Sequence, residues 1–334
     1  MKILITGGCG FVGSNLAIFL NKKKKIKVET LDNLTRKGSR FNLLTLKKNS
    51  IKNYNFDILN YKKFSKLKKY DLIIDCCAEA SIQYSKKNIN KVLNTNLIGT
   101  FNTLKKASMD KSKIIFLSTS RVYSINKIRE NYKKNNLKLI DEKFSNDSPI
   151  SIYGFTKLAS EKIIQEYSYI KNIRFIINRC GVLSGYNQFG KQDQGFLSLW
   201  VWSHLIKKNL KYIGFGGKGE QSRDVLDIDD LNNLIYLQIL KFDKINNKIF
   251  NVGGGKKNSI TLKRLTYLTE KVTKNKVNFK SIRKTSNYDV PYFITNNNLV
   301  AQTYNWYPKS NINELLIKIY NWQSKNIKNI KKYF

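Results

Sequence analysis

The chain has 334 residues, of which 41% are hydrophobic and 12% aromatic, so it can bury a large core in one or two domains. Its formal net charge is +38, but the lysines are spread over the whole chain and form no nucleic-acid-binding motif, so we expect no nucleic-acid partner. No stretch reaches the roughly 18 apolar residues of a membrane span, and the first strand begins too early for a signal peptide. We therefore expect a cytoplasmic protein without membrane contact.

Metal-ligating side chains are sparse. The four cysteines, Cys9, Cys76, Cys77 and Cys180, show no metal-ligand spacing, and we expect reduced, buried thiols. The single histidine, His204, lies in an apolar run, where a packed helix residue is expected. The sequence therefore predicts no metal site and excludes histidine-based catalytic triads.

The first thirteen residues predict a strand at 2–6, a glycine turn and the start of a helix. Gly7 lets the chain turn sharply, Gly10 lets the backbone approach a pyrophosphate, and Gly13 lets the helix pack tightly on the strand. The N–H groups that open the helix then face the phosphates. The candidate cofactor contacts here are Gly7, Gly10, Phe11, Val12 and Gly13.

A second strand, expected at 26–31, ends in Asp32, about twenty residues after the glycine turn. An acid at this place binds the adenosine ribose hydroxyls and repels the 2′-phosphate of NADP, so NAD is favoured. Asn33 and Arg36 lie in the polar loop 33–38 that follows Asp32, and both are candidate cofactor contacts. Arg36 either flanks the adenine or is a solvated charge, and it leaves NADP as an alternative cofactor. Together with the glycine turn, these residues predict a dinucleotide site.

Four further strands are expected, at 51–56, 71–76, 113–117 and 173–178. Asp57 is placed to accept a hydrogen bond from the adenine amino group, and the small Ala78 lets the cofactor pass close to a strand end. Glu79 either lines the substrate pocket or caps the next helix, and Asn96 is expected to bond a strand backbone and hold the floor of the site. The candidate cofactor contacts in these segments are Asp57, Ile58, Ala78, Asn96 and Ser118.

The alternation of strands and helices predicts an α/β protein with a doubly wound parallel (Rossmann) sheet and a smaller, interleaved C-terminal α/β substrate domain. The expected NAD-binding domain is 1–178 and about 220–252, and the expected substrate domain is 179–219 and 253–334. The polar connection 124–152 is longer than an ordinary connector, which is typical of a functional lid or of disorder. Helices are expected near 262–272 and 312–322, and 324–334 is expected to be a solvated face.

Tyr153 and Lys157 are four residues apart in a helical pattern and therefore lie on one helix face. A nearby ammonium and the positive nicotinamide ring both favour the phenolate, so a tyrosine with an ordinary pKa of about 10 can act as a base near neutral pH. Alone, such a pair is usually a surface pair. Downstream of a dinucleotide pattern and of Thr119 at a strand end, it is predicted to be catalytic.

These motifs make the chain resemble the extended short-chain dehydrogenase/reductase enzymes, the NAD-dependent epimerase/dehydratase family, over nearly its whole length. The segments that carry the resemblance are 6–13, 118–123, Tyr153-x-x-x-Lys157, 223–225 and 250–254. Within the family the chain looks most like the CDP-paratose 2-epimerase (CDP-tyvelose epimerase) group. The segments that suggest this are 32–38, 191–195 and 217–224.

The resemblance implies an enzyme that holds NAD tightly, acts on a nucleotide sugar and assembles as a dimer or tetramer. It makes Tyr153 the base, Lys157 its activator and a contact of the cofactor ribose, and Thr119 the hydroxyl beside the reacting oxygen. Arg223 would bind the substrate diphosphate, the alternative being a surface ion pair. The candidate substrate contacts are Glu79, Thr119, Arg121, Tyr153, Gln192, Asp193, Gln194 and Arg223.

The residues after Thr119 bear on the reaction. Sugar-nucleotide 4,6-dehydratases, as a family, place an Asp-Glu pair there, whereas this chain has Ser120-Arg121 and so lacks the acid and base for elimination. Epimerisation or simple ketoreduction is left, and the resemblance implies an isomerase, an NAD-dependent epimerase that inverts C2 of a nucleotide sugar through a keto-sugar. A 4-epimerase or ketoreductase of the same family is the alternative, and a non-catalytic NAD-binding sensor is a weaker one.

Overall fold

The structure is a computed structural model that describes residues 1–191 and 194–334. Its contacts divide the chain into two units. The first consists of Met1–Val122, Ile152–Arg179 and Asn232–Phe250, and the second of Tyr123–Ser151, Cys180–Leu231 and Asn251–Phe334. The chain thus alternates between the units, and its contacts group Tyr123–Ser151 with the second. The domain boundaries given above stay a prediction.

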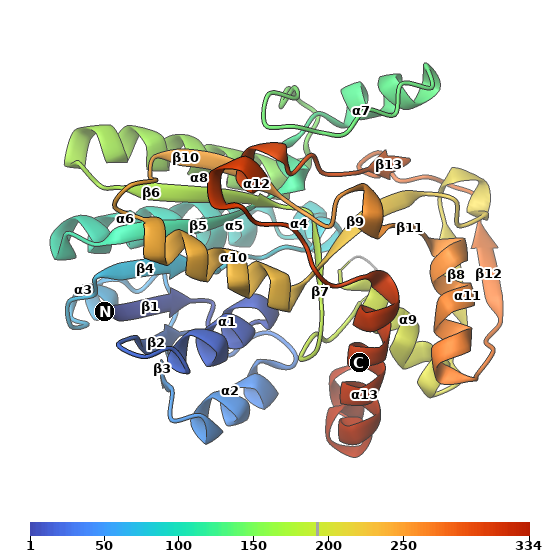
Figure 1. Ribbon diagram of the computed structural model, residues 1–334, viewed down its shortest axis with the longest axis horizontal. Helices are drawn as coiled ribbons and strands as arrows, with labels where there is room; N and C mark the ends of the chain where they lie inside the picture. The colour runs from blue at the N-terminus through green and yellow to red at the C-terminus, as the bar shows by residue number, and fades with distance from the viewer. Residues whose placement is uncertain (192–193) are drawn as a thin grey trace. The chain divides into compact units, whose positions relative to one another are not determined.

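The first unit is built on a seven-stranded sheet with the order β10-β6-β5-β4-β1-β2-β3 (Figure 1). Its strands are β1 (Lys2–Thr6), β2 (Lys27–Leu31), β3 (Lys52–Tyr54), β4 (Leu72–Asp75), β5 (Lys113–Thr119), β6 (Phe175–Cys180) and β10 (Lys248–Val252). The pairings of β1 with β2 and β4, of β2 with β3 and of β4 with β5 are all parallel. Since the order runs outward from β1 in both directions, the predicted doubly wound α/β fold is confirmed.

Helices cover both faces of this sheet. They are α1 (Phe11–Asn21), α2 (Ser39–Lys48), α3 (Tyr61–Ser65), α4 (Ile82–Lys87), α5 (Ile89–Leu93), α6 (Gly99–Asp110), α8 (Ser151–Lys171) and α10 (Ile228–Lys241), with a π-helical turn at Asn94–Ile98. On one face, Leu104 of α6 and Ile164 of α8 pack in one core with Phe116 of β5. On the other, Asn178 of β6 and Gln238 of α10 exchange hydrogen bonds of 2.9 and 2.8 Å.

A buried ion pair joins α8 to the sheet. The guanidinium of Arg179 donates to both carboxylate oxygens of Glu161 at 2.7–3.1 Å, and the Ser118 hydroxyl donates to the same carboxylate. The Glu161 side chain is 0% exposed and that of Arg179 is 7% exposed. Because a carboxylate buried without a cation is costly, this pair holds α8 against the ends of β5 and β6.

The second unit is organised around β9 (Ser222–Asp227), which pairs with β11 in antiparallel and with β7 and β13 in parallel orientation. The other strands of this unit are β7 (Val182–Ser184), β8 (Leu210–Ile213), β11 (Ser259–Thr261), β12 (Phe279–Ile282) and β13 (Tyr292–Phe293). Its helices are α7 (Ile125–Lys133), α9 (Phe196–Leu205), α11 (Leu262–Thr273), α12 (Asn298–Tyr304) and α13 (Ile312–Ile330). Trp200 of α9, Leu265 of α11 and Leu316 of α13 share one apolar core.

Two polar segments contain packed side chains. For 124–152 the alternative of disorder is wrong, whereas a functional lid stays a prediction. The connection 124–152 contains α7, which Ser124 caps by accepting from the N–H of Lys127, and Ile128 is buried on its inner face. The segment 324–334 is not simply a solvated face, since Ile330 is fully buried and the Phe334 ring stacks on Trp202 at 4.5 Å. In both segments a few apolar side chains outweigh many lysines, because the lysine stems can reach water from a packed helix.

The expectation for His204 is confirmed. It is buried in α9, and its Nδ1 lies 2.8 Å from the carbonyl oxygen of Trp200, one helical turn earlier. Burial lowers the pKa of the imidazole, so it stays neutral in the core. Across the described ranges, no helix is long and apolar enough to cross a membrane.

Arg179→Met is expected to lower the free energy of unfolding by about 3–5 kcal/mol, because the Glu161 carboxylate would stay buried without its cation. Arg174→Met is the matched control. Arg174 directly precedes β6 and pairs with Asp243, whose side chain is 70% exposed, so its loss should cost less than about 1 kcal/mol. Urea unfolding followed by circular dichroism measures both, and equal losses would contradict the role given to the buried pair.

Candidate functional site

The turn between β1 and α1 is closed on itself by backbone contacts. Gly7 has a positive φ of 64°, and its carbonyl accepts from the N–H of Gly10 at 3.0 Å. A Cβ on Gly13 would lie 2.3 Å from the carbonyl oxygen of Gly7, and one on Gly7 would lie 2.9 Å from backbone atoms of Cys76. These approaches allow no side chain, so the first turn of α1 lies directly against the strand ends.

Asp32 follows β2, and its carboxylate is held beside this turn. One oxygen accepts from the N–H of Cys9 at 3.0 Å, and the other accepts from the N–H of Leu34 at 2.8 Å. Burial raises the pKa of Asp32, while these two hydrogen bonds and the nearby Arg36 oppose the rise. The structure thus presents an oriented acceptor at the end of β2, as the sequence predicted for this strand end.

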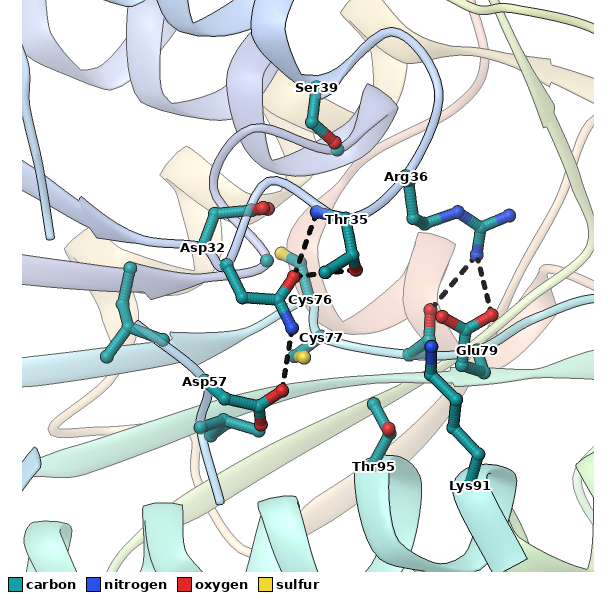
Figure 2. A pocket seen from close by; sticks show the side chains of 16 residues that line it. Asp32, Thr35, Arg36, Ser39, Asp57, Cys76, Cys77, Glu79, Lys91 and Thr95 are labelled. Carbon is teal, nitrogen blue, oxygen red and sulfur yellow. Dashed lines mark hydrogen bonds and ion pairs between the residues drawn. The ribbon is translucent and has the colours of Figure 1, made fainter. Parts of the chain in front are cut away.

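A pocket opens along the carboxyl ends of the strands, and Figure 2 shows Asp32 and Asp57 on one side of it, with Arg36 and Glu79 on the other. The predicted residues that line it are Gly7, Gly10, Asp32, Asn33, Arg36, Asp57, Ile58, Ala78 and Glu79. Arg36 contacts two other residues that line the pocket. Its Nη1 lies 3.3 Å from the Ala78 carbonyl oxygen and 3.6 Å from a Glu79 carboxylate oxygen. Asn33 donates to Asp57 at 2.7 Å.

Asn96 and Ser118, two further predicted cofactor contacts, are buried side chains that are not among the residues lining the pocket. The Asn96 amide accepts from the N–H of Glu79 at 2.8 Å and donates to its carbonyl at 3.2 Å. It also donates to the Thr156 hydroxyl at 3.0 Å, and so connects the end of β4 to α8. The Ser118 hydroxyl donates a hydrogen bond to the Glu161 carboxylate. Both side chains therefore form hydrogen bonds between elements of the first unit, and a contact with the cofactor stays a prediction for each.

The three predicted catalytic residues belong to two elements of the first unit. Thr119 ends β5, and its hydroxyl accepts from the N–H of Arg121 at 3.2 Å, in the short turn that follows the strand. Tyr153 lies in the first turn of α8 and Lys157 one turn later, so both side chains project from the same face. Thr119 is 8% exposed and Tyr153 9%.

Lys157 is a buried ammonium, 1% exposed, with its Nζ 3.8 Å from the centroid of the Phe116 ring. Burial lowers the pKa of Lys157, and the charges of neighbouring acidic groups oppose that fall, Asp75 first among them. A cation over an aromatic face is held by the quadrupole of the ring without losing its N–H donors. The arrangement leaves those donors for a phenolate or for ribose hydroxyls.

The remaining candidate substrate contacts belong to the second unit or lie outside the described residues. Arg223 lies in β9, and its Nη2 donates to Asp289 at 2.8 Å and to the carbonyl of Val290 at 2.6 Å. Gln194 pairs with Lys191 through backbone hydrogen bonds of 2.7 and 3.2 Å. Two predicted substrate contacts, Gln192 and Asp193, lie outside the described residues.

Comparison with known proteins decides the family. The family model described as the NAD dependent epimerase/dehydratase family matches residues 3–253, well over half of the chain. The chain belongs to this family. It is therefore an NAD-dependent enzyme, and the family and cofactor inferred from its motifs are confirmed.

Two relatives and one solved structure describe the similarity further. The chain is 29% identical to CDP-paratose 2-epimerase from Salmonella typhi over 340 residues, which cover 97% of this chain and 99% of the relative. It is 31% identical to dTDP-D-glucose 4,6-dehydratase from Dictyostelium discoideum over 260 residues, 75% of this chain and 58% of the relative. Its fold is similar to that of UDP-glucuronic acid 4-epimerase from Bacillus cereus, which was crystallised with UDP-glucuronic acid and NAD. The TM-score is 0.84 at 22% identity, and the match covers 97% of this chain and 99% of that chain.

The residues of the first unit fit the NAD of this family. The glycine turn has no side chain between the backbone of α1 and the pocket, which suits a pyrophosphate. Asp32 offers oriented oxygens to ribose hydroxyls, and Asp57 can accept from an adenine amino group. The pocket thus has the donors and acceptors that the adenosine half of the cofactor needs.

Several residues that line the pocket were not predicted. They are Leu31, Thr35, Ser39, Cys76, Cys77, Lys91 and Thr95. Cys76 and Cys77 directly follow β4, so the strand-end argument that selected Ala78 would also have found them. Burial raises the pKa of Cys77 well above its ordinary value, so this thiol is a neutral part of the wall. Lys91 of α5 and Thr95 of the π-helical turn follow no strand and belong to no motif, and the tertiary structure brings them to the pocket.

The ratio of NAD to NADP affinity should depend on Asp32. We expect the wild-type enzyme to bind NAD more tightly, and Asp32→Asn to reduce its preference at least about tenfold, because the negative charge that repels a 2′-phosphate is removed while an acceptor remains. Calorimetric titration with both dinucleotides measures the two affinities. Asp71→Asn is the control, since Asp71 precedes β4 at the opposite edge of the sheet. An unchanged ratio in Asp32→Asn would contradict this role.

Proposed function

We propose that this enzyme is a nucleotide-sugar epimerase that inverts C2 of the sugar by transient oxidation to a keto-sugar, on a substrate of the CDP-paratose or CDP-tyvelose type. The observation that carries the proposal is the similarity to CDP-paratose 2-epimerase, which extends over 97% of this chain and 99% of the relative. A full-length match supports a shared substrate module as well as a shared cofactor fold. The match to the dehydratase covers only 58% of that relative.

The turn after Thr119 supports epimerisation over dehydration. Elimination of water from a sugar needs an acid and a base beside the reacting carbons, and Ser120 and Arg121 supply neither. The backbone N–H of Arg121 is bound to the Thr119 hydroxyl, which fixes this turn against the strand end. The reaction that we assign to these residues is the removal and return of one hydroxyl proton, coupled to the removal and return of one hydride.

Tyr153 is assigned as the base that takes the proton from the sugar hydroxyl and later returns it. The Lys157 ammonium, one turn away on α8, stabilises the phenolate, and the buried surroundings strengthen that interaction. Thr119 is assigned to orient the reacting oxygen by a hydrogen bond. NAD held at the glycine turn and Asp32 would supply the hydride acceptor and donor that the reaction needs. Inversion requires the keto-sugar to present its other face before the hydride returns to the carbon.

Candidate substrate contacts are assigned one residue at a time, and each assignment rests on the chemistry of that side chain. Arg223 is proposed for the diphosphate, since a guanidinium has five N–H donors and can keep Asp289 while binding an anion. Glu79 and Arg121, at the strand ends of the first unit, are proposed for the sugar, as is Gln194 of the second unit. Gln192 and Asp193 stay predictions from the sequence.

One experiment tests the proposed function. The purified enzyme is assayed for retained NAD and incubated with CDP-, UDP-, GDP- and dTDP-sugars in ordinary and deuterated water, followed by proton NMR. We expect one CDP-sugar to reach equilibrium with its C2 epimer without added cofactor and without solvent deuterium at the inverted carbon, because the hydride returns within the site. Inversion at C4 would replace the substrate assignment, and a stoichiometric demand for NADH would replace epimerisation by ketoreduction.

Tyr153→Phe is expected to lower kcat at least about a thousandfold, because it removes the group that takes the proton, while NAD stays bound. Tyr169→Phe is the matched control, since Tyr169 lies on the same helix with 90% of its surface exposed and should leave kcat unchanged. Turnover is measured on the substrate found above. Retained turnover in Tyr153→Phe would exclude Tyr153 as the base.

A further inference from the structure

A row of three residues crosses the sheet beneath α8. Thr6 of β1 is in register with Asp75 of β4, and Asp75 is in register with Phe116 of β5. Residues in register on neighbouring strands point to the same face of a sheet. Phe116 belongs to the core formed with α6 and α8, so the Asp75 carboxylate also points to the face that these two helices cover.

Asp75 is a buried carboxylate with uncharged donors around it. It is 1% exposed and accepts from the Thr6 hydroxyl at 2.6 Å, from the Thr100 hydroxyl at 3.1 Å and from the N–H of Cys77 at 3.1 Å. Among the described residues, no cation lies within 4.0 Å of it. Its orientation is therefore fixed by neutral groups, and its charge acts on whichever cation is buried nearby.

Lys157 is that cation. Its Nζ lies over the ring of Phe116, the residue next to Asp75 in the sheet row. The other acidic carboxylate that acts on Lys157 is Glu161, and Arg179 already neutralises it through a bidentate ion pair. The thiols of Cys76 and Cys77 also oppose the fall in the pKa of Lys157. Burial keeps Cys77 protonated, and Asp75 acts on Lys157 more strongly than either thiol.

We propose that Asp75 is the counter-charge of Lys157, a positioning residue that keeps the ammonium protonated and turned toward Tyr153 from beneath the site. This rests on the role proposed above for Lys157. Asp75 touches neither the reacting atoms nor the cofactor pocket and acts through Lys157. Thr6 and Thr100, on β1 and α6, hold its carboxylate in place.

The direction of the effect follows from the charges. Burial lowers the pKa of Lys157 and the Asp75 carboxylate opposes that fall, so removal of the carboxylate lowers the pKa of Lys157 further. An ammonium with a lower pKa loses its proton at lower pH, and the phenolate of Tyr153 then loses its stabilising charge. The alkaline limb of the kcat profile should therefore move to lower pH when Asp75 is neutralised.

The first test is a stability cycle with Asp75→Asn, Lys157→Met and the double variant, measured as thermal unfolding midpoints of the full chain. We expect each single variant to lower the midpoint by at least about 5 °C and the double variant by clearly less than the sum, because each single change leaves one buried charge without its partner. Additive losses would overturn the proposal. If Asp75→Asn does not fold alone, the proposal requires the double variant to fold, and its failure to fold would overturn it.

The second test is the pH dependence of kcat. Asp75→Asn should move the alkaline limb to lower pH by about one unit. Thr100→Val is the control, since it removes one hydrogen bond of the same carboxylate and leaves its charge, and it should leave the limb in place. A uniform loss of kcat at every pH in Asp75→Asn would make Asp75 merely structural. The stability cycle needs no substrate, so its outcome stands apart from any failure of the proposed epimerase activity.

Discussion

The ion pair between Glu161 and Arg179 is the interaction on which the arrangement of the first unit depends. It is buried, bidentate and supported by Ser118, so α8 can neither rotate nor slide on the sheet without exposing one charge to an apolar core. Lys157 lies one helical turn before Glu161, and Tyr153 one turn before that. Tyr153, Lys157 and Glu161 therefore lie on one face of α8, and the ion pair that fixes Glu161 also fixes the direction of the other two side chains.

A parallel sheet ends all its strands at one edge, and this chain places its polar groups there. Asp32, Asp75 and Thr119 each end or directly follow a strand, and each accepts a hydrogen bond from a backbone N–H. The overall charge of +38 gives no hint of this distribution. The cofactor pocket itself is lined by Asp32, Asp57 and Glu79 as well as by cations, which suits ribose hydroxyls better than an additional phosphate.

Buried charges in this unit are matched in pairs, and the pairs have separate tasks. Glu161 and Arg179 hold an element in place by direct contact, whereas Asp75 is proposed to act on Lys157 without a direct ion pair, with the Phe116 ring beside the Lys157 Nζ. The first arrangement favours rigidity. The second leaves the N–H donors of Lys157 available, which a group that must stabilise a phenolate requires.

The sequence by itself determined the alternation of elements, the glycine turn and the acidic strand end at Asp32, because these features depend on residues close together in the chain. β1 runs from Lys2 to Thr6 as predicted, and α11 and α13 begin at the predicted residues. It also determined the family through short motifs. It could not show that α7 folds within a polar connection or that Phe334 packs on Trp202, since a few apolar contacts outweigh local composition there. Only the tertiary structure decided that Lys91 and Thr95 reach the pocket and that Asp75 lies in register with Phe116 beneath Lys157. These are relations between segments far apart in the chain, and sheet order and helix packing set them, not any local pattern.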